Sequence, residues 1–301
     1  MRKLIDFNTT LWFSTIMQVI REFDPWDGEL CTCPDKYSLN PYTGCDHRCI
    51  YCYATYIPNF FRPRRKKDLV ERVQKDLEKI PEGSLISLSN SSDPYLKMDK
   101  KYKDTRRCLK VLKKNGMKIL IVTKGVHVKR DIDILKRADC TVTISLCTLD
   151  EEVKKKLEPN ALSTRKRLEL VESLSKKGIS VGVRFDPIFP QLTESEINRV
   201  VKKVNEAGAE HVVSSTFKPR GDSWKRIELA FPEVADDVEK LYFEEGKKID
   251  NSYYLPKEKR KEILGKVAKE CEKNEIPFAS CREGLATLTT SESCDGSHLF
   301  K

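Results

Sequence analysis

The sequence lacks a long hydrophobic run, a recognisable secretory signal and an even number of cysteines. An apolar stretch near the N-terminus, Leu11–Ile20, contains Ser14, Thr15 and Gln18 and is too short to span a membrane. No small-residue cleavage site follows it, so we expect a short helix there and no membrane association. The eleven cysteines are therefore expected to serve metal or redox chemistry in a reducing, cytoplasmic compartment rather than pair as disulfides.

Apolar residues are also scarce, at 39% of the 301-residue chain, whereas charged residues make up 34%. This balance excludes a disordered chain and suits a globular protein with a heavily charged surface. The net charge is +10, and five cations lie within six residues: Arg62, Arg64, Arg65, Lys66 and Lys67. Such a run favours phosphate binding through counterion release, although a solvated surface is an equally ordinary explanation.

Short β-branched runs alternate with charged amphipathic segments from about residue 84 onward. The runs are typical of buried parallel strands, and they are Ser84–Ser89, Lys118–Thr123, Thr141–Cys147, Ser180–Phe185 and His211–Phe217. Helices are expected over about residues 67–79, 103–115, 130–137, 163–177 and 194–207. With Ser38–Gly44 as a first strand, six strand–helix units predict an α/β fold, a partial (β/α)6 barrel of parallel strands. Reactive residues are then expected at the carboxyl ends of the strands.

Three regions are expected along the chain. Residues 1–37 form an N-terminal extension, residues 38–225 the partial barrel, and residues 226–301 a helical C-terminal extension. Within the last region, residues 233–273 have a helical pattern and precede an irregular tail that contains cysteine.

Three cysteines with C-x3-C-x2-C spacing, Cys45, Cys49 and Cys52, form the most specific motif. For eleven randomly placed cysteines, such a triple is expected about 0.015 times per chain, so coincidence is a poor explanation. Three thiolates on one loop suit three irons of a 4Fe–4S cluster and leave the fourth iron open for chemistry. A structural zinc ion with His47 as its fourth ligand is the alternative.

Asn40–Tyr53 resembles the cluster loop of the radical S-adenosylmethionine (SAM) superfamily, and within it the spore photoproduct lyase-like (DNA repair photolyase-like) group. The similarity covers about residues 38–220. Its further segments are Ser92–Tyr95, Val122–Gly125, Arg130–Asp133, Ser145–Asp150, Leu157–Pro159, Arg167–Leu168 and Phe185–Pro190. The resemblance implies an enzyme whose 4Fe–4S cluster cleaves SAM reductively to a 5′-deoxyadenosyl radical, which takes a hydrogen atom from the substrate. A reductant such as ferredoxin or flavodoxin is then an expected partner.

The resemblance also assigns residues that bind SAM. Two tyrosines contact the adenine, two serines accept from the methionyl amino group, a lysine pairs with the carboxylate and a serine reaches the ribose. An arginine is a second candidate for the carboxylate. In that order they are Tyr51, Tyr53, Ser91, Ser92, Lys124, Ser145 and Arg184. Ordinary ion pairs for the two cations and a satisfied buried hydroxyl for Ser145 are the alternatives.

One departure from the resembled group concerns hydrogen return to the substrate. In the spore enzymes a cysteine that serves this purpose precedes the Asp of the Ser-Asp segment, whereas here Asn90, Ser91 and Ser92 precede Asp93. This departure argues against thymine-dimer repair. Cys147, at the end of a predicted strand, is a candidate catalytic hydrogen donor, and a buried structural thiol is the alternative.

Four further cysteines lie in polar, turn-like surroundings at the two ends of the chain: Cys31, Cys33, Cys281 and Cys294. Such placement is typical of metal-binding loops, and many enzymes of the resembled superfamily hold auxiliary clusters. We hypothesise a second metal centre here, an iron–sulfur cluster rather than zinc, with His298 as a reserve ligand. Unliganded reduced thiols are the alternative.

Three functions fit these observations. The first is a radical SAM enzyme, a lyase or modification enzyme, that acts on nucleic acid through DNA repair or RNA modification. Its support is the positive charge, the basic run and the aromatic residues Tyr56, Phe60 and Phe61, which are suited to stack on an extruded base. The second is radical SAM modification of a protein or small molecule. The third is a non-catalytic iron–sulfur or zinc protein that binds nucleic acid.

Overall fold

The computed structural model describes residues 18–23, 30–88 and 90–300. Most of Leu11–Ile20, where a helix is expected, lies outside these residues, and Ile20 itself begins a strand. In the described part of the chain no helix has both the length and the apolar character needed to cross a membrane.

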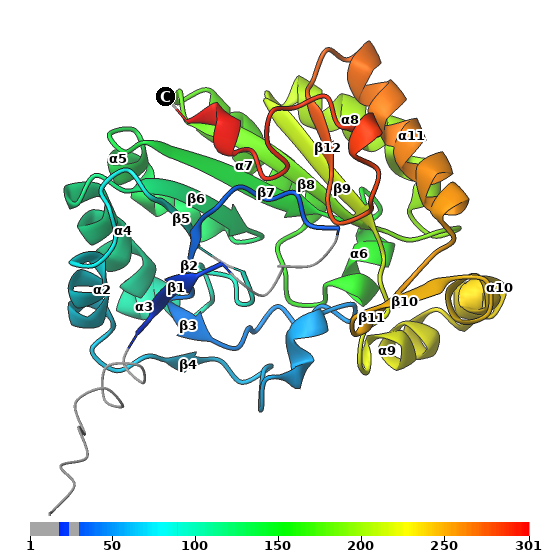
Figure 1. Ribbon diagram of the computed structural model, residues 1–301, viewed down its shortest axis with the longest axis horizontal. Helices are drawn as coiled ribbons and strands as arrows, with labels where there is room; N and C mark the ends of the chain where they lie inside the picture. The colour runs from blue at the N-terminus through cyan, green and yellow to red at the C-terminus, as the bar shows by residue number, and fades with distance from the viewer. Residues whose placement is uncertain (1–17, 24–29, 89, 301) are drawn as a thin grey trace, which may run out of the picture.

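One sheet of eight strands organises the molecule (Figure 1). Its order is β1 (Ile20–Glu22), β2 (Tyr37–Leu39), β5 (Leu85–Leu88), β6 (Lys118–Thr123), β7 (Cys140–Leu146), β8 (Ser180–Ile188), β9 (His211–Thr216) and β12 (Phe278–Ser280). All neighbours pair in parallel except β1, which pairs antiparallel with β2. The six predicted strands are present in the predicted order, so the α/β partial-barrel prediction is confirmed. Two short strands at the edges, β1 and β12, were not predicted.

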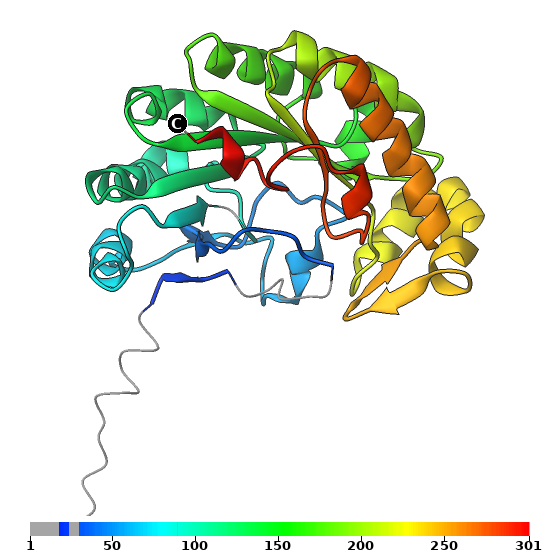
Figure 2. The same ribbon diagram turned by 45° about the horizontal axis from the view of Figure 1, so that its top comes forward.

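The helices between the strands lie along the convex outer side of the curved sheet (Figures 1 and 2). They are α2 (Leu69–Leu77), α4 (Asp104–Lys114), the one-turn α5 (Ile132–Leu135) after a 3-10 turn (Val126–Asp131), α7 (Thr164–Ser175) and α8 (Ile197–Glu206). Each turns an apolar stripe to the sheet; in α8 the stripe is Val200, Val201 and Val204, all fully buried. An unpredicted helix, α6 (Glu151–Leu157), follows β7 and is capped by Asp150, whose carboxylate accepts from two backbone N–H groups.

The C-terminal region contains α9 (Ser223–Ala230), α10 (Pro232–Phe243), the hairpin β10–β11 (Lys247–Ile249 and Ser252–Tyr254) and α11 (Lys257–Lys273). The prediction of helix throughout residues 233–273 is therefore wrong at the hairpin. Gly246 explains the interruption, because a Cβ there would lie 2.3 Å from the carbonyl oxygen of Tyr254. After α11 the chain returns to the sheet as β12, beside β9.

The segment between β2 and β5 lies at the lower edge of the sheet in Figure 1. It contains the small hairpin β3–β4 (Tyr42–Thr43 and Arg64–Arg65), a 3-10 helix η1 (Tyr53–Tyr56) and α2. A short helix, α3 (Asp99–Tyr102), follows β5. The cysteine motif is the loop between β3 and η1, so the fold brings this loop to the carboxyl ends of the parallel strands.

Candidate active site

The loop Cys45–Cys52 is fixed by its own backbone. Gly44 precedes it with a φ of 85°, and a Cβ there would lie 2.4 Å from the carbonyl oxygen of Phe60. The N–H of Cys45 donates to that same carbonyl at 2.8 Å. On the other side, the Arg226 guanidinium of α9 donates to the carbonyls of Ile50 and Cys52, at 2.7 Å each. With its backbone held from both sides, the loop keeps its thiols free for a ligand.

A cavity of about 320 Å³ opens between this loop and the ends of the strands. It is lined by residues from both ends of the chain as well as from the barrel. Among the predicted site residues, those that line it are Cys31, Cys33, Cys45, Cys49, Tyr51, Cys52, Tyr53, Ser91, Lys124, Ser145, Arg184 and Cys281. Ser92, Cys147 and Cys294 lie outside the lining. The cavity thus brings together most of the site residues that the sequence predicted.

Ser91 and Ser92 are positioned by Asn40, the first residue of the resembled motif. The Asn40 Oδ1 atom accepts from the N–H of Ser91 at 3.1 Å and from that of Ser92 at 3.3 Å. The Ser92 hydroxyl is buried and has no hydrogen-bond partner among the described residues. Tyr53 is tied to the same turn, because its hydroxyl donates to the carbonyl of Asn90.

Asp93 joins the turns that follow β5 and β6, a role that the sequence prediction missed. Its carboxylate accepts from the N–H of Tyr95 at 2.8 Å, the hydroxyl of Thr123 at 2.8 Å and the N–H of Lys124 at 2.7 Å. Nδ1 of His47 lies 3.6 Å from the same carboxylate. His47 therefore turns Nδ1 toward Asp93 and also lines the cavity.

A second buried carboxylate, Glu158, joins Tyr51 of the cluster loop to Lys124 and Arg167. It accepts from the Tyr51 hydroxyl, pairs with the fully buried Arg167 and lies 3.8 Å from Nζ of Lys124. Burial alone raises the pKa of Glu158, but Arg167 and Lys124 together lower it to about 2. Burial likewise lowers the pKa of Lys124, and the charges of Cys49 and Glu158 outweigh that effect and raise it. Glu158 and Arg167 lie in segments that carried the resemblance, although no role was predicted for either.

Arg184 lies between the two sets of cysteines. It donates to Asp186 at 2.8 Å, and its Nη2 atom is 3.8 Å from Sγ of Cys281. Asp186 in turn accepts from Ser215 at 2.5 Å. Its role on the SAM carboxylate stays a prediction, because the guanidinium already has a carboxylate partner within the chain.

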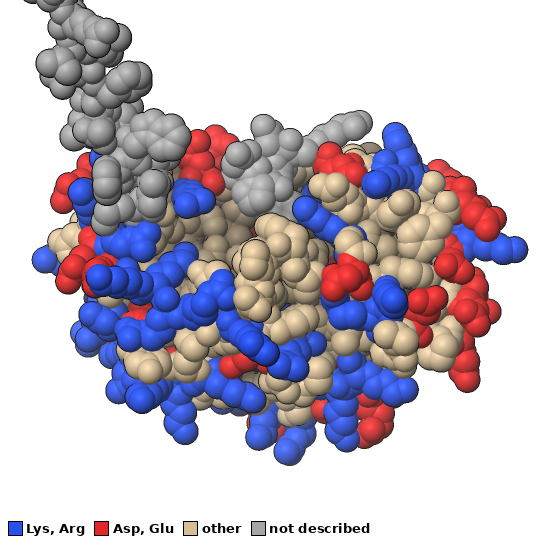
Figure 3. Space-filling model, turned by 90° about the horizontal axis from the view of Figure 1, so that it is seen from below, with Lys and Arg blue, Asp and Glu red and all other residues tan. Residues whose placement is uncertain are grey.

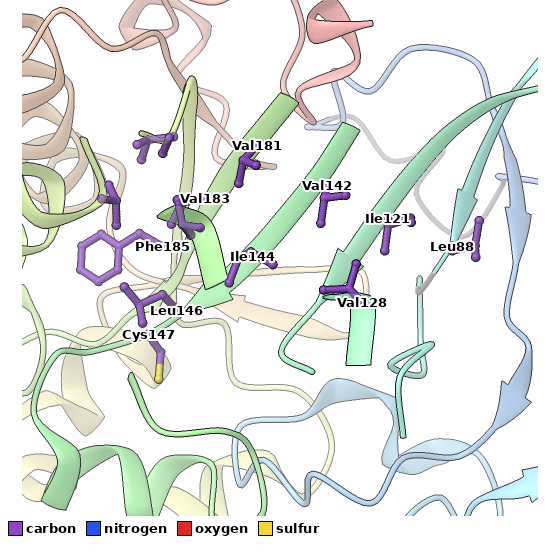
Figure 4. Close-up of a cluster of buried hydrophobic side chains, with 14 of the residues drawn as sticks. Leu88, Ile121, Val128, Val142, Ile144, Leu146, Cys147, Val181, Val183 and Phe185 are labelled. Carbon is purple, nitrogen blue, oxygen red and sulfur yellow. The ribbon is translucent and has the colours of Figure 1, made fainter. Parts of the chain in front are cut away.

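Cys147 is 1% exposed and belongs to the apolar core. Figure 4 shows it with the cluster that includes Leu146 and Phe185. Burial raises the pKa of its thiol. Because the side chain lies outside the cavity lining, its placement favours the structural alternative over the hydrogen-donor prediction.

The four cysteines from the chain ends gather beside β9 and β12. The Cys294 thiol donates to Sγ of Cys33 at 3.4 Å, and both cysteines pack with Cys281 around buried Val213 and Ala279. Hydrogen bonds from Cys294 and Cys31 lower the pKa of Cys33, and Lys36 lowers it further. His298, the predicted reserve ligand, instead hydrogen-bonds Ser293 at 2.8 Å.

All eleven cysteines are free thiols. Within the described residues, no three His, Cys, Asp or Glu side chains have the arrangement of a single-ion site. The residues nevertheless fit a 4Fe–4S cluster with SAM, because three thiols share one loop, line a cavity and leave a fourth position to a ligand. An unpartnered buried hydroxyl and a lysine at the same strand ends suit an amino acid moiety.

This fold and this site define a partial-barrel protein that holds a cofactor at the carboxyl ends of its strands. The chain belongs to the Radical SAM superfamily, whose sequence model matches residues 39–204.

The chain is also similar in sequence to several curated proteins, and its fold is similar to that of a solved structure. An uncharacterized protein of Acidianus two-tailed virus is 28% identical over 246 residues, which are 73% of this chain and 81% of that protein. The radical SAM Nalpha-GlyT isomerase of Pseudomonas phage M6 is 26% identical over 194 residues, 61% of this chain and 40% of the phage protein. Spore photoproduct lyase, solved with bound AdoMet and a dinucleoside spore photoproduct, superimposes with a TM-score of 0.67 at 18% identity, over 86% of this chain and 79% of that one.

Proposed function

We propose that this chain is a radical SAM enzyme that modifies or repairs a nucleic acid. The observation that carries the proposal is the charge of the cavity, whose lining contains seven lysines and arginines against three aspartates, an excess of four positive charges. The cations are Lys36, Arg48, Lys124, Arg184, Lys218, Arg220 and Arg282. Five of these cations pair with carboxylates of the chain, and within the described residues Arg48 and Arg220 have no such ion pair and remain to meet a polyanionic substrate.

When bound, the cluster and SAM supply a one-electron cleavage that yields a 5′-deoxyadenosyl radical able to take a hydrogen atom from substrate. Cys45, Cys49 and Cys52 would hold the cluster. Lys124 would orient the carboxylate of SAM, and Ser91, which lines the cavity, its amino group. The walls that Tyr51 and Glu158 complete would keep bulk water from the reacting atoms.

The surface beside the cluster loop is also basic. Figure 3 views the molecule from the side of the loop, and Lys and Arg side chains gather over its left half, where β4, α3 and α4 lie. In and around the cluster loop, Arg48, Arg62, Arg64 and Lys97 are exposed, and the N–H of Lys97 donates to Asp46 of the loop at 3.2 Å. Phosphates that follow this surface would lead a strand to the cavity.

An exposed aromatic residue beside the cavity supports the same substrate class. Tyr56 of η1 is 65% exposed, and the Arg220 guanidinium lies over its ring at 5.5 Å. Tyrosine and arginine planes are platforms on which unstacked bases bind. Of the other predicted stacking residues, Phe61 lines the cavity, and Phe60 is buried and packs against Phe61.

The proposal is tested with the anaerobically reconstituted chain, SAM and dithionite. Production of 5′-deoxyadenosine that rises with added single-stranded DNA or RNA, together with one altered nucleoside in a mass-spectrometric digest, is the expected result. If 5′-deoxyadenosine forms but binding to DNA and RNA is absent at low salt, the substrate is a protein or small molecule instead. If no 5′-deoxyadenosine forms, the non-catalytic alternative replaces both enzyme hypotheses.

A further inference from the structure

Four cysteines from opposite ends of the chain meet at one edge of the sheet. Cys31 and Cys33 lie in the segment before β2, whereas Cys281 follows β12 and Cys294 lies in the tail. The N–H of Cys281 donates to the carbonyl of Ser214 at 2.9 Å, which continues the pairing of β12 with β9 past its last residue. The sheet itself therefore presents Cys281 to the N-terminal segment.

A buried ion pair holds the two segments together at this place. Nζ of Lys36 lies 2.5 Å from the Asp295 carboxylate, and both side chains are buried. Asp295 directly follows Cys294, and Lys36 is three residues after Cys33. Because an isolated buried charge is costly, the pair fixes Cys33 and Cys294 near each other, and their sulfur atoms are 3.4 Å apart.

Cations and apolar groups surround the four sulfur atoms. Nη2 of Arg184 lies 3.8 Å from Sγ of Cys281, and the buried cation Lys36 is three residues after Cys33. Fully buried Val213 and Ala279 close the side toward the sheet. Positive neighbours and a dry wall are what a group of thiolates needs when it binds a metal centre away from bulk water.

We propose that Cys31, Cys33, Cys281 and Cys294 bind a second 4Fe–4S cluster, ligated entirely by protein, which joins the two ends of the chain. Zinc is disfavoured because, in the described residues, no three such side chains have single-ion geometry. The same holds for Cys45, Cys49 and Cys52, where membership of the superfamily implies a cluster. A 4Fe–4S cluster places a cage of iron and sulfide between its thiolates, so its four ligands do not have to converge on a single ion.

The second cluster has a different task from the first. Four protein thiolates leave none of its irons open, so it binds no SAM and stabilises the fold instead. Cys31, Cys33 and Cys281 also line the cavity, so the cluster forms part of the wall that the substrate meets. This inference is independent of the substrate class.

The test uses a variant that lacks the first site, Cys45→Ala/Cys49→Ala/Cys52→Ala, in the full-length chain. After anaerobic reconstitution with iron and sulfide, this variant is expected to keep about four irons and four sulfides, against about eight of each for the unaltered protein. Cys281→Ala/Cys294→Ala is expected to keep about four irons and to make 5′-deoxyadenosine still. Electron paramagnetic resonance of the reduced triple variant would show a 4Fe–4S signal without any contribution from the SAM site.

Cys271→Ala is the matched control, since Cys271 is a buried thiol of α11 outside both sets, and its iron content is expected to equal that of the unaltered chain. The inference would be overturned if the triple variant bound no iron or bound stoichiometric zinc. A Cys33–Cys294 disulfide found by mass spectrometry would also overturn it. Circular dichroism checks that the triple variant is folded, so that a loss of iron reflects the four cysteines of the second site and not unfolding.

Discussion

The hydroxyl of Tyr51 donates a hydrogen bond to the buried carboxylate of Glu158. Tyr51, which lies between Cys49 and Cys52, is thereby anchored to the end of α6, the helix that follows β7. Glu158 also pairs with Arg167, whose guanidinium donates to the carbonyl of Ser145 at 2.9 Å. One carboxylate thus links the cluster loop to a strand end that is predicted to contact the ribose of SAM.

Glu158→Gln is expected to lower the free energy of unfolding by about 3–5 kcal/mol, because it leaves the Arg167 guanidinium buried without a counter-charge. The measurement is anaerobic denaturant unfolding of the reconstituted protein. Glu172→Gln removes the acid of an exposed pair with Lys176 and serves as the control, with no measurable change expected. The double variant Glu158→Gln/Arg167→Met should recover part of the loss. A single variant as stable as the control would show that this ion pair does not stabilise the fold.

The sequence predicted strands far better than it predicted partnerships such as Glu158 with Arg167. Lys118–Thr123 was predicted with the bounds of β6, because a buried parallel strand needs a continuous apolar run that is visible locally. Phe278–Ser280 has only three residues, too few for any period to show, and is a strand only because β9 lies beside it. Whether such a short segment forms a strand depends on its neighbours in the folded protein, and the local sequence does not show those neighbours.

Site residues follow the same division. The thiols Cys45, Cys49 and Cys52 share one loop, so their spacing alone predicted a common site. Asp93 accepts from Thr123, 30 positions away, and Glu158 accepts from Tyr51, 107 positions away. No single-sequence pattern reports such distant pairs. Cys147 directly follows β7, near where the catalytic prediction placed it, but its side chain packs in the apolar core, and the sequence pattern does not report that packing.

Gly44→Ala is expected to reduce the iron content of the SAM site by about half or more, since the added Cβ meets the Phe60 carbonyl at 2.4 Å and φ is 85°. The displaced carbonyl is the acceptor for the N–H of Cys45, so the first ligand moves with it. Iron and sulfide are measured in the Cys281→Ala/Cys294→Ala background, which isolates this site.

Gly83→Ala is the control that separates the effect of backbone strain from the effect of a steric clash in Gly44→Ala. Gly83 has a similar φ of 78°, but nothing lies within 4 Å of the added Cβ. The substitution is expected to cost about 1–2 kcal/mol of stability from left-handed backbone strain and to leave iron content unchanged. Equal iron loss in both glycine variants would contradict the steric explanation.

Lys124→Met is expected to weaken SAM binding about 10- to 100-fold while iron content stays at the level of the unaltered protein, because a charged hydrogen bond to the carboxylate is lost. Lys124 lines the cavity, and its ion-pair neighbour Glu158 is 3.8 Å away, so a carboxylate from SAM has room to approach. Anaerobic calorimetry gives the affinity. Lys129→Met, on the exposed side of the following turn, should bind SAM normally. Unchanged affinity in the Lys124 variant would remove this residue from the proposed SAM site.

Tyr56→Ala is expected to weaken binding of single-stranded nucleic acid about 5- to 100-fold, the effect of losing one stacked base. Tyr56 is exposed and carries Arg220, a residue of the cavity lining, over its ring. Tyr102 carries Arg65, which lies outside the lining, over its ring at 4.1 Å. Tyr102→Ala therefore removes a similar aromatic–arginine pair at a different place and should retain most of the affinity.

Fluorescence anisotropy over a range of salt concentrations separates the two contributions, because phosphate contacts set the slope of log K against log salt and stacking sets its offset. If Tyr56→Ala lowered the slope and left the offset unchanged, the Tyr56 ring would order nearby cations rather than stack on a base. If Tyr56→Ala and Tyr102→Ala lost equal affinity, the nucleic acid would bind across the wider basic surface.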